Sequence, residues 1–139
     1  MCIAKTKLCL CIKRLPKKLD QMDEFLNYDD KLNQWINKLP PSCIYSSEMR
    51  PGSSGPPLFV HRSLLHMTYH TVVSALHRSQ LLSSAVSTRS ECSELQDVSW
   101  LKVREASRAV TRISREIRFH GLENYLSTTG VTVLLSATN

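Results

Sequence analysis

Apolar residues recur every three or four positions through residues 98–120, and this spacing constrains the fold more than any other feature of the chain. The residues in this series are Val103, Ala106, Val110, Ile113 and Ile117. Such steps place the side chains on one face of an α-helix, where they can pack against a neighbouring helix. Gly121 follows at the position where a glycine in the left-handed conformation commonly ends a helix. The pattern therefore predicts one long amphipathic helix that ends near Gly121.

Two earlier segments carry apolar residues at the same helical spacing. Those in residues 19–39 include Phe25, Leu32, Trp35 and Leu39, and those in residues 58–82 include Leu65, Tyr69, Val72, Val73 and Leu76. We expect a helix in each segment, with a break near residues 27–30 in the first. Aromatic residues make up only 6% of the chain, which favours packing between helices over a β-sandwich. The predicted fold class is all-α, a helical bundle or array, although VTVLL at residues 131–135 fits a strand or a buried helix equally well.

Proline, glycine and serine are concentrated in residues 40–57. This segment, PPSCIYSSEMRPGSSGPP, contains five of the six prolines and two of the four glycines. Proline disfavours the helical conformation at the preceding residue and lacks a backbone donor, so Pro40 and Pro41 are expected to end the first helix. We predict a linker or a long, variable surface loop that adds nothing to the core, inside a helical region of residues 19–139. Residues 1–18 form a separate, basic N-terminal segment in this division.

The net charge of +6 is concentrated in the N-terminal segment and in the late helix. Four arginines on that helix form a row at three- and four-residue steps: Arg104, Arg108, Arg112 and Arg115. Positive charge attracts anionic partners, nucleic acid included, without identifying one. Glu105 and Glu116 are spaced for intrahelical ion pairs, and no Asn or Gln is interleaved to read DNA bases. The row is a candidate basic face for solvent or a protein partner, with nucleic-acid binding as an alternative.

The cysteines and the apolar runs limit the class of protein. The five cysteines are irregularly placed and include no C-x-x-C pair, so neither a disulfide framework nor a zinc ribbon is expected. The longest late apolar run, residues 131–137, is far shorter than the roughly 20 residues that span a bilayer. The early stretch LCLCI is too short for the apolar region of a signal peptide. We expect a soluble, intracellular chain without membrane contact.

Residues with catalytic or metal-binding potential are few. No serine lies in a G-x-S-x-G motif and no glycine-rich phosphate loop is present, so no catalytic residue and no cofactor are predicted. His66, His70 and His77 share one face of the predicted helix, but no third ligand accompanies a pair of them. We expect these histidines at the border between core and solvent, without a metal. One alternative function is a small-molecule-binding module with a pocket lined by His66, Tyr69, His70 and Arg78.

Three stretches, in this order along the chain, resemble the fungal-specific transcription factor domain. They are LNQWINKLPPSC (32–43), LLHMTYHTVVSALHRSQLL (64–82) and VREASRAVTRISREI (103–117). Members of this family show a Leu-x-x-Trp-x-x-x-Leu-Pro stretch, a helix with Leu-x-x-x-Tyr that ends in Leu-His-Arg-Pro, and an Ala-rich helix. The matching signature residues are Trp35, Leu39, Pro40, Tyr69, His77 and Arg78. In the family, this all-helical regulatory region follows a zinc binuclear cluster.

The resemblance implies a nuclear regulator of transcription that acts by interdomain or partner contacts, with coregulator proteins or a small-molecule inducer as further partners. Zinc and direct DNA contact are expected only in a cluster of cysteines that this chain lacks. The chain therefore resembles a C-terminal fragment that reaches DNA through a missing zinc-cluster domain or a partner protein.

His77 and Arg78 are expected at the C-terminal end of their helix, where cations meet exposed carbonyls. Ser79 follows them, where the family has proline. As a hypothesis, the core contains Trp35, Leu65, Tyr69, Leu76, Val110 and Ile113.

Overall fold

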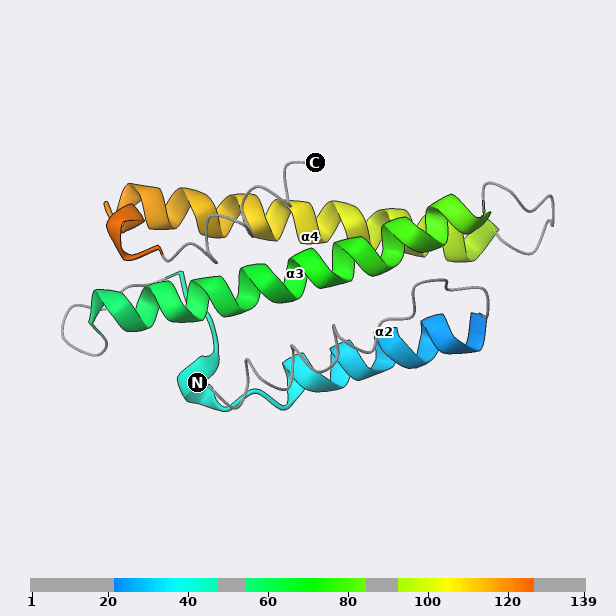
Figure 1. The fold of residues 1–139 in the computed structure, drawn as a ribbon, viewed down its shortest axis with the longest axis horizontal. Helices are drawn as coiled ribbons and strands as arrows, with labels where there is room; N and C mark the ends of the chain where they lie inside the picture. The colour runs from blue at the N-terminus through cyan, green and yellow to red at the C-terminus, as the bar shows by residue number, and fades with distance from the viewer. Residues whose placement is uncertain (1–21, 48–54, 85–92, 127–139) are drawn as a thin grey trace.

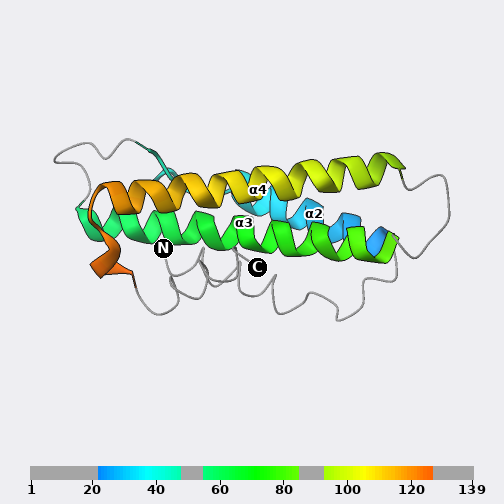
Figure 2. The same cartoon turned by 90° about the horizontal axis from the view of Figure 1, so that it is seen from above.

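The computed structural model describes residues 22–47, 55–84 and 93–126. Its elements are the helices α2 (Met22–Asn37), α3 (Pro56–Ser84) and α4 (Ser93–Phe119), and the single 3-10 turns η1 (Pro41–Cys43) and η3 (Glu123–Tyr125). In Figure 1, α3 lies between α2 and α4 and runs antiparallel to both, and Figure 2 shows the pair of α3 and α4 with α2 behind it. These ranges contain no strand, and the predicted all-α array is confirmed. The basic segment 1–18 and VTVLL at 131–135 lie outside the described residues.

Helix α2 is continuous, and the expected break near residues 27–30 is wrong. The Asn33 side-chain amide donates to Asp29 Oδ2 at 3.2 Å, one turn earlier. Asn and Asp side chains can interrupt a helix by bonding to its backbone groups. Here they bond to each other, so the helix continues through residues 27–30. Beyond Asn37 the backbone of Pro40 is extended (φ −64°, ψ 149°), so the prolines end the helix as predicted.

Both ends of the proline-rich segment belong to the fold, which corrects the prediction of a loop that adds nothing to the core. At its start, Cys43 N–H donates to the Pro40 carbonyl at 2.8 Å, and this turn carries the Cys43 side chain into the core, where it is 1% exposed. At its end, Pro56 and Pro57 form the first turn of α3. Proline suits this position because the N–H that it lacks would have no partner inside the helix.

The predicted cap at the C-terminal end of α4 is confirmed. Gly121 has a φ of +63°, in the left-handed region that a β-carbon disfavours. Its N–H donates to the Arg118 carbonyl at 3.0 Å, and Leu122 N–H donates to the Ile117 carbonyl at 3.0 Å. These are the two bonds of a Schellman cap, and the Ile117 and Leu122 side chains pack together in the core beneath it.

The core consists of two clusters. The α2 cluster contains Phe25, Leu32, Trp35, Leu39, Cys43, Leu65, Tyr69, Val72, Val73 and Leu76. The α4 cluster contains Phe59, Val60, Met67, Val110, Ile113, Ile117 and Leu122. Both depend on α3, whose faces pack against α2 on one side and α4 on the other. All six residues of the predicted core are buried, so that prediction is confirmed.

Candidate functional site

Four of the six signature residues lie where α2 joins α3. Trp35, Leu39 and Tyr69 are buried in the α2 cluster. The Trp35 and Tyr69 rings stack with their centroids 5.5 Å apart. Pro40 is exposed and precedes η1, the turn that carries Cys43 inward. Their status as a family signature stays a prediction, and their contacts hold α2 against α3.

The expected position of His77 and Arg78 at a helix end is wrong, because α3 continues to Ser84. Ser79 stands where the resemblance predicts a proline, and the helix continues unbroken through it. Its hydroxyl donates to the Leu76 carbonyl at 2.6 Å. Neither His77 nor Arg78 therefore reaches the last carbonyls of α3. His77 is also buried in the interior, not placed at the border between core and solvent.

His77 joins the three helices through its two ring nitrogens. Nε2 donates to Asp29 Oδ1 of α2 at 3.2 Å, and Nδ1 shares a hydrogen bond with the Ser99 hydroxyl of α4 at 3.1 Å. The donor is assigned to Nε2 because an ionised carboxylate can only accept. Lys102 Nζ of α4 lies 3.9 Å from Asp29 Oδ2. These four residues, which we call the polar junction, tie α2 and α4 to the middle of the array.

The polar junction favours the ionised form of Asp29. The hydrogen bond from His77 lowers the pKa of the Asp29 carboxyl below its usual value, and the Lys102 charge acts in the same direction against the opposing effect of burial. Asp29 and Ser99 were not predicted from the sequence as partners of His77. They lie 48 and 22 residues from it along the chain, where no local spacing connects them.

The chain of hydrogen bonds from Ser99 through His77 to Asp29 has the residue types of a serine hydrolase triad. Its setting differs, because Ser99 and His77 are each only 1% exposed. A catalytic nucleophile has to lie within reach of a substrate atom. A substrate cannot contact a serine hydroxyl that is this deeply buried. The arrangement therefore acts as a structural tie between helices.

The basic face lies along the exposed side of α4. Its four arginines, Arg104, Arg108, Arg112 and Arg115, are all exposed and border one open groove. The ion pairs found among the described residues both involve Asp29, so none of the four arginines has a carboxylate partner there. The expected pairs with Glu105 and Glu116 do not form. Glu116 instead accepts a hydrogen bond from the Tyr45 hydroxyl, which draws it towards the segment after η1.

Exposed apolar side chains precede the basic face on α4. Trp100 is 63% exposed and Leu101 is 55% exposed. Trp100, Arg104 and Arg108 follow at four-residue steps and therefore share one side of the helix. Even with this surface, none of the described helices combines the length and the apolar character needed to cross a bilayer.

His66 and His70 are half-buried on α3. Tyr45 N–H donates to His66 Nε2 at 3.1 Å, which fastens the segment after η1 to α3. Burial lowers the pKa of His66, and burial together with His66 and Arg112 lowers the pKa of His70 to about 4. Both rings are therefore neutral near pH 7. Across the three described ranges, no group of three His, Cys, Asp or Glu side chains is arranged to hold a metal ion.

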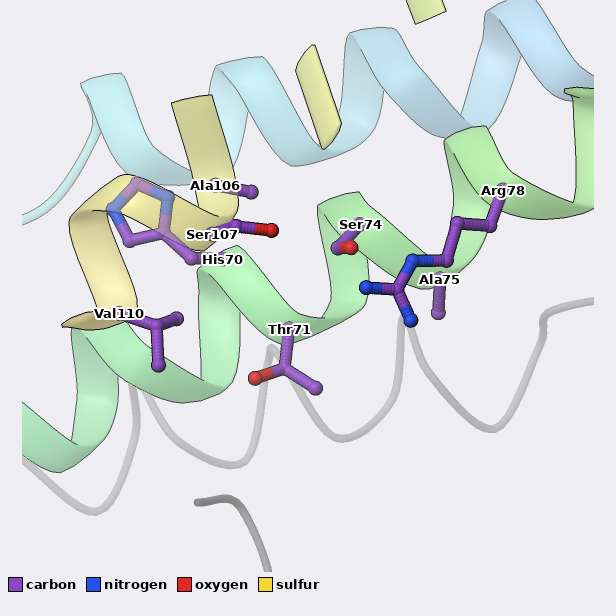
Figure 3. A pocket seen from close by; sticks show the side chains of 8 residues that line it. All are labelled: His70, Thr71, Ser74, Ala75, Arg78, Ala106, Ser107 and Val110. Carbon is purple, nitrogen blue, oxygen red and sulfur yellow. The ribbon is translucent and has the colours of Figure 1, made fainter. Parts of the chain in front are cut away.

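Two of the four residues expected to line a ligand pocket do line one. His70 and Arg78 border a cleft between α3 and α4 (Figure 3), together with Thr71, Ser74, Ala75, Ala106, Ser107 and Val110. The volume of this cleft is about 130 Å³. His66 and Tyr69 lie elsewhere, because His66 bonds Tyr45 and Tyr69 packs in the α2 cluster.

Three curated proteins from fungi are similar to this chain. Cutinase transcription factor 1 beta of Fusarium vanettenii is 34% identical over 169 residues, which cover 99% of this chain and 19% of that protein. The transcription factor cpaR of Aspergillus oryzae is 34% identical over 120 residues, which cover 84% of this chain and 20% of that protein. A transcription factor of Fusarium pseudograminearum is 29% identical over 129 residues, 88% of this chain and 14% of that protein. No protein-family model and no solved structure matches the chain.

The similarity extends over most of this chain and over a small part of each relative. The chain spans 19% and 20% of the length of the first two relatives. It is therefore homologous to a segment of fungal transcription factors.

Proposed function

We propose that this chain is a helical regulatory segment of a nuclear fungal transcription factor, and that it regulates transcription through contacts with other protein segments, without catalysis. The homology to fungal transcription factors supports the class of protein. The exposed side of α4 supports the mode of action, because it presents Trp100, Leu101 and the basic face to solvent. This surface is the observation that carries the proposal.

The partner we propose is an acidic protein segment with an apolar residue, from another part of the transcription factor or from a coregulator. Tryptophan and arginine are the residue types that dominate the binding energy of protein interfaces. Trp100 and Leu101 provide a large apolar contact, and Arg104 and Arg108 lie one and two turns further along. Carboxylates pair with such arginines through two parallel hydrogen bonds. The surface therefore matches an acidic segment in both charge and apolar character.

In this proposal, DNA contact and zinc belong to another part of the protein or to a partner. A zinc binuclear cluster requires several cysteines side by side. Cys43, the cysteine that the described ranges contain, is buried alone in the α2 cluster. The described residues therefore do not fit such a cluster.

The basic face of α4 favours a second candidate function, which is nucleic-acid binding. Four exposed arginines along one side of a helix attract phosphates by charge alone. No Asn or Gln is interleaved between Arg104 and Arg115 to contact base edges. Binding of this kind would be independent of sequence.

A tethered reporter assay tests the proposed function. Residues 1–139 are fused to an unrelated DNA-binding domain upstream of a reporter gene in a fungal host. We expect the fusion to change reporter expression relative to the DNA-binding domain alone. The double substitution of Trp100→Ala with Arg104→Ala should reduce that change severalfold, because it removes both kinds of contact.

The matched control is Arg118→Ala with Phe119→Ala, which removes an exposed arginine and an exposed aromatic residue from the opposite end of α4. This control should keep the effect of the fusion. If the fusion acts like the DNA-binding domain alone, or if both double variants lose the effect equally, the proposal is wrong.

Salt dependence separates the two candidate functions. The chain is titrated with duplex DNA at about 50 mM and about 200 mM salt. Saturable binding that weakens steeply with salt, and less steeply after Arg108→Ala and Arg112→Ala, supports nucleic-acid binding. Absence of binding at both concentrations excludes it and favours a protein partner.

A further inference from the structure

Most of the side chains that line the cleft between α3 and α4 are short. Ser74 and Ala75 of α3 line the cleft together with Ala106 and Ser107 of α4, which lie beside His70 (Figure 3). Such side chains fill too little of the space between two helices, so a void of about 130 Å³ remains. Pockets for drug-sized ligands measure roughly 300–1,000 Å³. This cleft therefore has room for a small ligand.

Arg78 supplies the charge of the cleft. Its side chain reaches back along α3, so that the guanidinium lies beside Ala75 on the side of Ser74 (Figure 3). Arg78 is half-buried, and it forms no ion pair within the described part of the chain, where both ion pairs involve Asp29. A partly desolvated cation without a counter-ion is unfavourable. An anion in the cleft would relieve that cost.

One hydroxyl in the cleft is free to donate to such an anion. The Thr71 and Ser107 hydroxyls each donate to a backbone carbonyl of their own helix at 2.9 Å, so their hydrogens are already used. The Ser74 hydroxyl has no hydrogen-bond partner among the described residues and lies one helical turn before Arg78. A guanidinium and a hydroxyl in this arrangement match the two oxygens of one carboxylate.

The remaining lining determines the charge and shape that the cleft accepts. The pKa of His70 is lowered to about 4, chiefly by burial, so its ring is neutral near pH 7 and Arg78 is the one positive charge of the lining. Ala75, Ala106 and Val110 add apolar surface beside that charge. One cation next to an apolar wall suits a monoanion with a short hydrocarbon body better than it suits a phosphate dianion.

We propose that the cleft binds a small aliphatic monocarboxylate. The Arg78 guanidinium and the Ser74 hydroxyl hold its carboxylate, and its hydrocarbon body lies against Ala75, Ala106 and Val110. The ligand bridges α3 and α4. This inference goes beyond the proposed function. The cleft contains neither Trp100 nor the basic face, and binding of a ligand in the cleft can be measured on the isolated chain.

Titration of residues 1–139 with butyrate, followed by NMR, tests the proposal. We expect saturable shifts of the Arg78 side-chain signal and of the Ser74 and Ser107 amides. Butyramide has a similar shape without the charge, and it should bind at least about tenfold more weakly because it loses the charged pair with Arg78. Inorganic phosphate should also bind more weakly. Equal binding of butyramide, or tighter binding of phosphate at these residues, overturns the carboxylate assignment.

Variants of the lining locate the site. Arg78→Gln should weaken butyrate binding at least about tenfold, and Ser74→Ala severalfold, because each removes one contact to the carboxylate. Ala75→Leu leaves the charge in place and fills the cleft from its exposed edge, so it should abolish the saturable shifts. The matched control is Arg118→Gln, which removes an exposed arginine outside the cleft and should leave the affinity unchanged.

Thermal unfolding of each variant checks that it folds. Unchanged affinity in folded Arg78→Gln, saturable binding in folded Ala75→Leu, or an equal loss in Arg118→Gln would refute the site.

Discussion

The two interfaces of α3 differ in what holds them. Against α4, buried apolar residues recur along most of the helix, from Val103 to Ile117. Against α2, the helices approach each other at fewer positions, and the α2 cluster combines apolar packing with the stacked rings of Trp35 and Tyr69 and the bond between Asp29 and His77. Two helices that stay close along most of their length resist local opening more than two helices that approach at fewer positions. We therefore expect α3 and α4 to form the stable unit and α2 to be the helix that detaches first.

The largest effect is expected when the interface between α3 and α4 receives a charge. Ile113→Asp places a carboxylate at a position that is 1% exposed in the α4 cluster, without a cationic partner. The loss should be about 4–5 kcal/mol or more, enough to unfold a marginally stable domain. Far-UV circular dichroism during urea unfolding measures it, with Thr111→Asp at an exposed position of the same helix as the control. Wild-type stability in Ile113→Asp would contradict the assignment of this interface.

The next largest effect is expected at the interface between α2 and α3. Trp35→Ala removes the ring stacked on Tyr69 and should cost about 3–5 kcal/mol. Hydrogen exchange should show that the amides of α2 lose protection while those of α4 keep theirs. The control is Trp100→Ala, which removes the exposed tryptophan and should change stability by at most about 0.5 kcal/mol. An equal loss of protection in all three helices would show that the array unfolds as one unit.

A smaller effect is expected at the polar junction. Asp29→Asn keeps the shape of the side chain and removes its charge, so the hydrogen bond from His77 and the attraction to Lys102 both weaken. The expected loss at pH 7 is about 1–2 kcal/mol in the free energy of unfolding. The neighbouring exposed variant Asp30→Asn should lose little, and an equal loss there would show that the effect is one of general charge.

The difference in free energy of unfolding between wild type and Asp29→Asn should depend on pH, because the pKa of Asp29 is lowered in the folded state. The contribution of the ionised carboxylate is fully present above the unfolded-state pKa of about 3.9, and it is lost as the pH falls through the lower pKa of the folded state. Wild type and Asp29→Asn should therefore differ in stability at pH 7 and converge in strong acid. Urea unfolding as a function of pH measures the two curves, and a gap that persists in strong acid would exclude the carboxylate charge as its source.

The smallest effect is expected at Ser63 of α3, and it has the opposite sign. Its hydroxyl is buried and has no hydrogen-bond partner among the described residues. Ser63→Ala removes the unsatisfied group and should stabilise the chain by up to about 1 kcal/mol. Thermal unfolding measures the change. A clear loss of stability would indicate that the hydroxyl has a partner outside the described ranges.

Features that depend on residues close together in the chain were predicted correctly. The cap at Gly121 and the buried stripe on α4 were predicted because both depend on neighbours within a few positions. The errors arose where one polar or proline residue was given too much weight. The acidic stretch at 27–30 did not break α2, and Pro56 and Pro57 began a helix instead of belonging to a loop. At 27–30 the polar side chains bond each other, as Asn33 bonds Asp29, and at 56–57 the prolines suit the first turn of a helix because the N–H that they lack would have no partner there.

The sequence by itself determined the all-α class, the three main helices and the identity of the core, since helical spacing is a property of residues close together in the chain. Only the tertiary structure decided how the signature pair is used. His77 bonds to Asp29 and Ser99, which lie 48 and 22 residues away, and Arg78 borders a cleft whose other wall belongs to α4. The spacing of apolar residues predicts which face of a helix is buried. The packing of the three helices decides which polar groups from different helices meet at that face.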